Sequence, residues 1–155
     1  MDAAFWHVFK SVCFWSPFCA WMMAQFTKML CGFTRTRKVD FNYLVSTGGM
    51  PSAHSAMATG LAASVGITYG FESIYFVIVL ASTLVVMFDA ATVRRASGLQ
   101  ARLLNEMVDE LFKQHRFSER KLAELLGHTR MEVFLGMIMG ILVAMIVTAA
   151  PYLWE

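Results

Sequence analysis

Gly48-Gly49-Met50-Pro51-Ser52-Ala53-His54-Ser55 is the stretch that most constrains the fold and the chemistry of this chain. It joins a glycine-rich bend to an apolar helix, expected over 51–69, and places a histidine in the first turn. The start of a helix offers unbonded backbone N–H groups and the positive end of the helix dipole, and both favour a phosphate group. The stretch therefore predicts a phosphate-binding helix start that carries an imidazole.

The chain around this stretch is strongly apolar. Of its 155 residues, 57% are hydrophobic and 15% are charged, which excludes an ordinary soluble globular protein. A membrane-spanning helix needs roughly 20 apolar residues, and four stretches approach or exceed that length, at about 12–33, 51–69, 71–93 and 133–154. We therefore expect one all-α membrane domain over 1–155, a bundle of about four transmembrane helices with an amphipathic helical segment, 94–130, between the last two.

The positive charges orient this bundle. All but Lys10 and Lys28 of the 13 Lys and Arg residues lie at 34–50 or 94–130, which four spans place on one side of the membrane. Cytoplasmic loops carry the excess of Lys and Arg. The sequence therefore predicts an integral protein of a bacterial inner membrane with both loops, and the histidine site, on the cytoplasmic side.

The segment 94–130 has a helical period. Leu99, Leu103, Met107 and Leu111 recur at helical spacing, and a second short helix is expected from Ser118 to Gly127. One interpretation is a pair of amphipathic helices on the membrane surface. The other is a lid over the histidine site.

A second histidine, His128, precedes the last apolar helix. Rows of small residues lead from both histidines, Ala58, Ala62, Gly66 and Gly70 from His54, and Gly136, Gly140, Ala144 and Thr148 from His128. Such rows let membrane helices approach closely. If the two rows pack on one another, the imidazoles meet at the cytoplasmic end of the pair. The alternative is that each row packs on a different helix or on a second copy of the chain.

Other polar residues fall near the same end. The candidate phosphate-binding residues are Lys28, Lys38, Gly49, Ser52, Arg94 and Arg95, and Asp89 is a structural or site carboxylate. Two roles are open for Glu132. It can close a capping box with Thr129, or its carboxylate can accept a hydrogen bond from one ring nitrogen of His128 and leave the other as a nucleophile.

Three blocks of this sequence have a counterpart in a known group of proteins. They are Gly48–Ser55, Asp89–Asn105 (DAATVRRASGLQARLLN) and Leu126–Gly140 (LGHTRMEVFLGMIMG), and Ala24–Lys28 also fits the first helix of that group. Together they resemble the divergent small-membrane-protein branch of the type 2 phosphatidic acid phosphatase and vanadium haloperoxidase superfamily. Ala53 stands at the glycine of that superfamily's Pro-Ser-Gly-His motif.

The resemblance implies metal-free hydrolysis of a phosphomonoester or diphosphate, without a cofactor, through a phosphohistidine. Carried over by position, His128 is the nucleophile, Glu132 its orienting partner in place of aspartate, and His54 the general acid. The Arg-Pro pair of the superfamily's first motif is missing, and Arg94 and Arg95 are the substitutes that we suggest.

The leading hypothesis is a lipid phosphatase at the cytoplasmic leaflet, for which phosphatidate, phosphatidylglycerol phosphate and polyprenyl phosphates are all suitable substrates. The alternative is a membrane protein that binds or transports such a lipid without cleaving it. A metal site built from Asp89, His54, His128 and Glu132 ranks last, because their spacing matches no known metal pattern.

For partners, we expect a phosphorylated lipid and membrane lipids but no nucleic acid. A homodimer is a further interpretation, with Met137, Met139 and Met145 as candidate interface residues.

Overall fold

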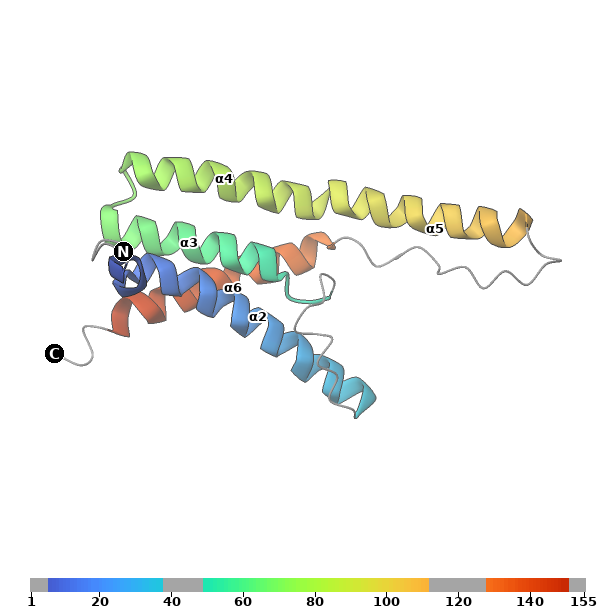
Figure 1. Ribbon diagram of the computed structural model, residues 1–155, viewed down its shortest axis with the longest axis horizontal. Helices are drawn as coiled ribbons and strands as arrows, with labels where there is room; N and C mark the ends of the chain where they lie inside the picture. The colour runs from blue at the N-terminus through green and yellow to red at the C-terminus, as the bar shows by residue number, and fades with distance from the viewer. Residues whose placement is uncertain (1–5, 38–48, 112–127, 151–155) are drawn as a thin grey trace.

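The computed structural model describes residues 6–37, 49–111 and 128–150. All regular elements within these ranges are helical, a short 3-10 helix η1 (Val8–Lys10) followed by α2 (Val12–Thr36), α3 (Ala53–Tyr69), α4 (Ile74–Ala91), α5 (Val93–Leu111) and α6 (Arg130–Ala149). In Figure 1, α2, α3, α4 and α6 form the body of the molecule and α5 extends beyond it. The predicted all-helical fold is confirmed for the described residues.

Serine and threonine caps set where these helices begin. Ser11 Oγ accepts a hydrogen bond from the Cys13 N–H at 3.2 Å, so α2 begins at Val12. The helix continues through Pro17. Ser73 Oγ accepts from the Phe76 N–H at 3.2 Å and starts α4 at Ile74. Such caps satisfy backbone donors that would otherwise have no partner, which is why the helices start there.

α3 is the centre of the body, and α2, α4 and α6 all pack against it. The core between α2 and α3 is built from alanines, Ala20 and Ala24 on one helix and Ala53 and Ala56 on the other. A methyl group added at Gly60 would lie 3.0 Å from Ala20 Cβ, so these two helices are already in close contact. Small side chains therefore bring the helix axes close together, as in many membrane bundles.

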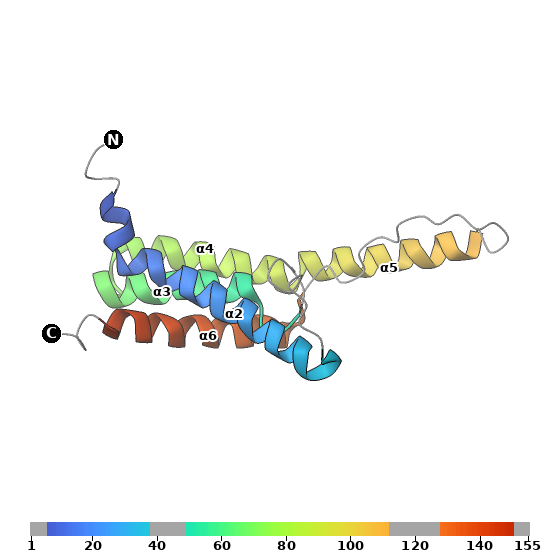
Figure 2. The same cartoon turned by 60° about the horizontal axis from the view of Figure 1, so that its bottom comes forward.

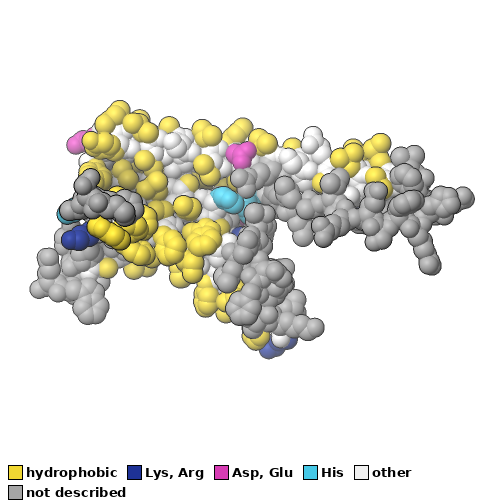
Figure 3. Space-filling view, in the orientation of Figure 1, with side chains coloured by type: hydrophobic (Ala, Val, Ile, Leu, Met, Phe, Trp, Pro, Cys, Tyr) yellow, Lys and Arg dark blue, Asp and Glu magenta, His cyan; other side chains and the backbone are white. Residues whose placement is uncertain are grey.

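The outer surface of the body is apolar. Val85 and Phe88 on α4 are each 69% exposed, and hydrophobic side chains cover much of the face shown in Figure 3. By length and composition alone, two helical stretches in the described ranges can cross a membrane, Ile74–Val108, which includes all of α4 and most of α5, and α6. The described α3 has 17 residues, and α2 carries the buried Lys28. The count of four spans stays a prediction.

α5 continues the direction of α4 after a break at Thr92. The Thr92 N–H still donates to the Phe88 carbonyl oxygen at 3.0 Å, but the backbone of Thr92 leaves helical geometry with a φ of −120° and a ψ of −68°, which ends α4. The expected helix through Leu99 and Leu111 is confirmed, and in Figures 1 and 2 it points away from the body. The second predicted helix, Ser118–Gly127, lies outside the described residues, so the surface-helix and lid interpretations stay predictions.

Candidate active site

The two predicted histidines lie side by side at the end of the body where α3 and α6 begin. His54 is in the first turn of α3, and His128 comes directly before Thr129, the N-cap of α6. The ring centroids are 6.4 Å apart and the ring planes are inclined by 55°. His128 is almost fully buried, whereas His54 is half-buried. Figure 3 shows a histidine reaching the surface beside an acidic side chain where the body meets the extension.

Backbone contacts hold the two helix starts together. The Ser52 N–H donates to the Glu132 carbonyl oxygen at 2.9 Å, which ties the cap of α3 to the first turn of α6. The His128 N–H donates to the Ala90 carbonyl oxygen at 3.3 Å, which ties the residue before α6 to the end of α4. Three helix ends are therefore fixed around the ring pair. No sequence signal pointed to Ala90, because only its backbone is used.

The row of small residues on α6 packs as expected, but the row on α3 does not. Gly136, Gly140, Ala144 and Thr148 are all buried on α6. The atoms nearest to Gly136 and Gly140 belong to Ser52, the N-cap of α3, and to Ser55, Ala56, Thr59 and Gly60, and none of them belongs to Ala58, Ala62 or Gly66.

The reason is that the row that starts at His54 faces α4. The Ala58 carbonyl oxygen accepts from Thr83 Oγ1 at 3.1 Å, and Gly66 lies under Phe71 and Phe76. The expected packing of the His54 row on the His128 row is therefore wrong, although the two rings still meet.

Glu132 makes both of the contacts that the sequence left open. Its Oε2 accepts from the Thr129 N–H at 2.9 Å, and its own N–H donates to Thr129 Oγ1 at 3.3 Å, which completes a capping box. The same Oε2 lies 3.2 Å from His128 Nδ1. An ionised carboxylate can only accept, so this contact assigns the proton of the neutral ring to Nδ1 and the lone pair to Nε2.

Lys28 brings a positive charge to the site from α2. Its side chain is only 3% exposed, and it lies within Coulombic range of Glu132. Its Cδ lies 4.0 Å from the position that a Cβ would take at Gly49, which has a φ of +87°. Gln25, one turn earlier on α2, is also buried, and sequence reasoning did not single it out as a site residue. A buried lysine within Coulombic range of a carboxylate that itself contacts a histidine is a typical feature of a functional site.

The other candidates are placed as follows. Ser52 is fully buried, and its Oγ caps α3 by accepting from the Ser55 N–H at 3.4 Å. Asp89 is half-buried in the last turn of α4, next to Ala90. The backbones of Arg94 and Arg95 lie in the first turn of α5, but their side chains, like all of Lys38, fall outside what the structure describes. Across the described ranges, no three His, Cys, Asp or Glu side chains group as metal ligands.

The predicted dimer methionines have intramolecular neighbours. Met137 and Met145 line a hollow between α3, α4 and α6, and Met139 packs against the alanine core. A homodimer through these residues stays a prediction.

Comparison with known proteins now identifies the group to which this arrangement belongs. The model of the Divergent PAP2 family matches residues 9–143, which include both histidines, Glu132 and Lys28. The chain belongs to this family. It is also 36% identical over 142 residues to the uncharacterized membrane protein YuiD of Bacillus subtilis, an alignment that covers 84% of this chain and 90% of YuiD. No solved structure matches. The family and this relative support the assignment as a membrane protein.

Proposed function

We propose that this chain is a membrane-embedded phosphatase that hydrolyses a phosphomonoester or diphosphate of a lipid through a phosphohistidine on His128. The observation that carries the proposal is the His54–His128 ring pair, 6.4 Å between centroids, with the Glu132 carboxylate 3.2 Å from His128 Nδ1. The name of the family favours the same class of reaction. The distribution of Lys and Arg favours a site on the cytoplasmic face of a bacterial inner membrane.

In the first step, His128 attacks the phosphate. Because the Nδ1–H of His128 donates a hydrogen bond to Glu132 Oε2, the lone pair of Nε2 is available to form the N–P bond. The P–O bond to the lipid breaks as the new bond forms. His54, protonated and on the other side of the phosphorus, gives its proton to the leaving oxygen.

In the second step, water releases the phosphate. The neutral His54 takes a proton from the water as the water oxygen attacks phosphorus, and the P–N bond breaks to return the lone pair to His128. Lys28 and the first N–H groups of α3 stabilise the negative charge on the phosphoryl oxygens in both steps. The buried position of Lys28 strengthens this interaction, because little water screens it.

The first test is phosphate release by the detergent-purified protein from a panel of lipid phosphates in the presence of a chelator. We expect release by the wild type, loss in His54→Ala and His128→Ala, and full activity in the matched control His7→Ala, an exposed histidine in the N-terminal part of the chain. No release from any lipid, with phospholipid binding retained, would favour the alternative function, binding or transport without cleavage.

A second test separates the roles of the two histidines. A nitrophenyl phosphate has a leaving group that departs without a proton, whereas an alkyl phosphate needs one. His54→Ala should therefore lose much more activity with the alkyl phosphate than with the nitrophenyl phosphate. His128→Ala should lose both equally. Equal losses in His54→Ala would contradict its role as general acid.

A further inference from the structure

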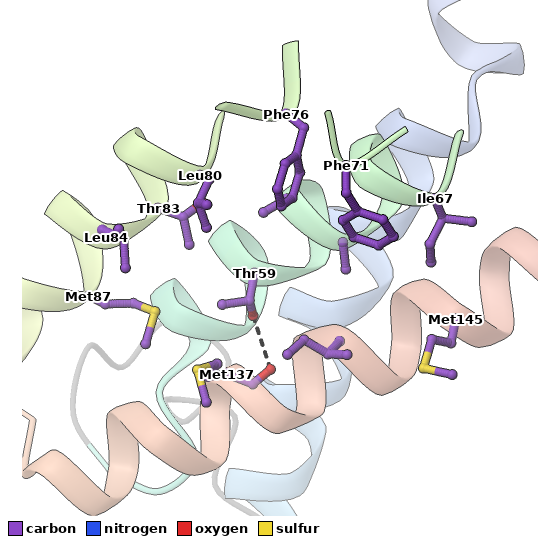
Figure 4. A pocket seen from close by; sticks show the side chains of 13 residues that line it. Thr59, Ile67, Phe71, Phe76, Leu80, Thr83, Leu84, Met87, Met137 and Met145 are labelled. Carbon is purple, nitrogen blue, oxygen red and sulfur yellow. Dashed lines mark hydrogen bonds between the residues drawn. The ribbon is translucent and has the colours of Figure 1, made fainter. Parts of the chain in front are cut away.

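The hollow between α3, α4 and α6 is a long apolar groove next to the candidate site. It has a volume of about 410 Å³ and is lined by side chains from all three helices, as Figure 4 shows. The threonine hydroxyls in its lining already form hydrogen bonds within the protein. Thr83 Oγ1 donates to the Ala58 carbonyl oxygen at 3.1 Å, and Thr59 Oγ1 lies 2.7 Å from the Ser55 carbonyl oxygen and 3.2 Å from that of Met137. An occupant therefore meets an almost wholly apolar surface.

The groove begins close to the histidines on each of its three helices. Thr59 on α3 and Met137 on α6 each lie roughly 7.5 Å along the helix from His54 and Glu132, respectively, at the rise of an α-helix. Met87 on α4 is one turn before Ala90, whose carbonyl oxygen accepts from the His128 N–H. The groove therefore runs lengthwise away from the ring pair.

The row of small residues that starts at His54 connects the ring to the groove. Ala58 contacts Thr83 on α4, and Ala62, one turn further, lines the groove. At its sides the groove is lined by exposed residues, among them Leu84 at 58% and Met145 at 53%, so a chain in the membrane can enter laterally.

The length and lining of the groove fit a hydrocarbon chain. From Thr59 to Ile67 the groove extends about 12 Å along α3. Apolar side chains line it over this length, so a single hydrocarbon chain can lie along α3 without burying a polar group.

We propose that this groove holds one hydrocarbon chain of the phosphorylated lipid, with the phosphate at the His54–His128 pair. The inference rests on the proposed function for the identity of the head group, but not for the position of the chain. The charges fit this orientation, because Lys28 and the start of α3 favour an anion at the histidine end of the groove.

Photolabelling with hexadecylphosphonate that carries a diazirine in the middle of its chain tests the groove. Its C–P bond resists hydrolysis, so labelling does not depend on catalysis. We expect label on residues of the groove, such as Met137, and severalfold less label when unlabelled hexadecylphosphonate competes. A diazirine near the head group should label the end at Thr59, and one at the chain terminus should label the end at Ile67.

Two variants provide the matched comparison. Ala63→Phe fills the groove and should reduce the competed labelling severalfold, whereas Ala81→Phe adds the same ring to the exposed side of α4 and should not. Two results in the wild type would overturn the proposal, whether or not the variants fold. One is label that is no stronger in the groove than on Val85 and Phe88, and the other is groove label that does not respond to competition. A detergent-stable dimer that Ala63→Phe dissociates without any competed labelling would also overturn it.

The outcomes separate this proposal from the proposed function. Competed groove labelling without phosphate release from any lipid would support the lipid-chain groove and contradict the phosphatase activity. Phosphate release that depends on both histidines, without groove labelling, would support the phosphatase activity and contradict the lipid-chain groove.

Discussion

Replacing Gly136 by alanine tests the closest packing behind the histidine pair. The added Cβ would overlap the Ser52 carbonyl oxygen and lie 3.2 Å from the Ser52 carbonyl carbon and 3.0 Å from Ser55 Cβ, where ordinary contacts are 3.4 Å or longer. Ser52 has little room to retreat, because its N–H is bonded to the Glu132 carbonyl oxygen at 2.9 Å. The strain therefore falls on the contact between the starts of α3 and α6.

Two opposing effects set the sign of the change. Alanine is about 1 kcal/mol better than glycine in a helix interior, which alone would stabilise α6. Overpacking of a tight contact costs about 1–3 kcal/mol, and backbone atoms relax less than side chains. We expect a net loss of up to about 2 kcal/mol, or a Tm lower by up to about 8 °C. Displacing His54 from His128 by even about 1 Å should also reduce activity on the order of a hundredfold.

Thermal unfolding and phosphate release of the purified protein measure both effects. Gly66→Ala is the matched control, because its added methyl meets the rings of Phe71 and Phe76 at the far end of α3 from the site. These rings line the groove and not the histidine pair, so we expect this control to keep full activity with a water-soluble nitrophenyl phosphate. A raised Tm together with full activity in Gly136→Ala would refute the close approach of α3 and α6 that the site requires.

Three further predictions concern the charges of the site and its side of the membrane. Glu132→Gln keeps an acceptor for the Thr129 N–H but loses the negative charge, so activity should fall about a hundredfold or more with little change in Tm. Glu132→Ala loses the acceptor as well, so it should also destabilise α6 by about 0.5–2 kcal/mol in thermal unfolding. Lys28→Met should abolish most phosphate release and also lower Tm, because it leaves the Glu132 carboxylate without its positive partner. A cysteine at Gln100, with the native cysteines replaced by serine, should react with a membrane-impermeant maleimide in inside-out vesicles and not in intact cells.

The packing of α6 could be predicted from the sequence because its small residues form a single row. Gly136, Gly140, Ala144 and Thr148 share one face among bulky neighbours, so the helix has one place for a close partner. The capping box of Thr129 and Glu132 could be predicted for a similar reason, since a local spacing determines it.

The orientation of α3 could not be predicted in the same way. This helix is small and polar on several sides, with Ser55, Ala56, Gly60, Ala62 and Ser64 all buried. Periodicity shows which faces allow close approach, but it does not say which of three neighbours takes each face. The hydroxyls decide part of the answer, because Thr59 reaches the Met137 carbonyl oxygen on α6 and Thr83 of α4 reaches Ala58.

The direction of α5 relative to α4 also could not be predicted from the sequence. The change from an apolar to an amphipathic pattern near Arg94 marks where the membrane-spanning composition ends. It does not say whether the backbone turns onto the membrane surface or continues, as it does here, in line with α4 (Figure 2).

The site at the end of the bundle explains why its core is built from small side chains. His54 and His128 can share one phosphorus atom only if the helices that carry them approach closely, and the 6.4 Å between their centroids is reached because Gly136 presents no side chain to Ser52. Leucine in these positions would bury more apolar surface but would separate the rings. A membrane bundle gains little from such burial, because lipid chains are as apolar as the core. Small residues therefore cost this protein less stability than they would cost a soluble one, and they give the two imidazoles their spacing.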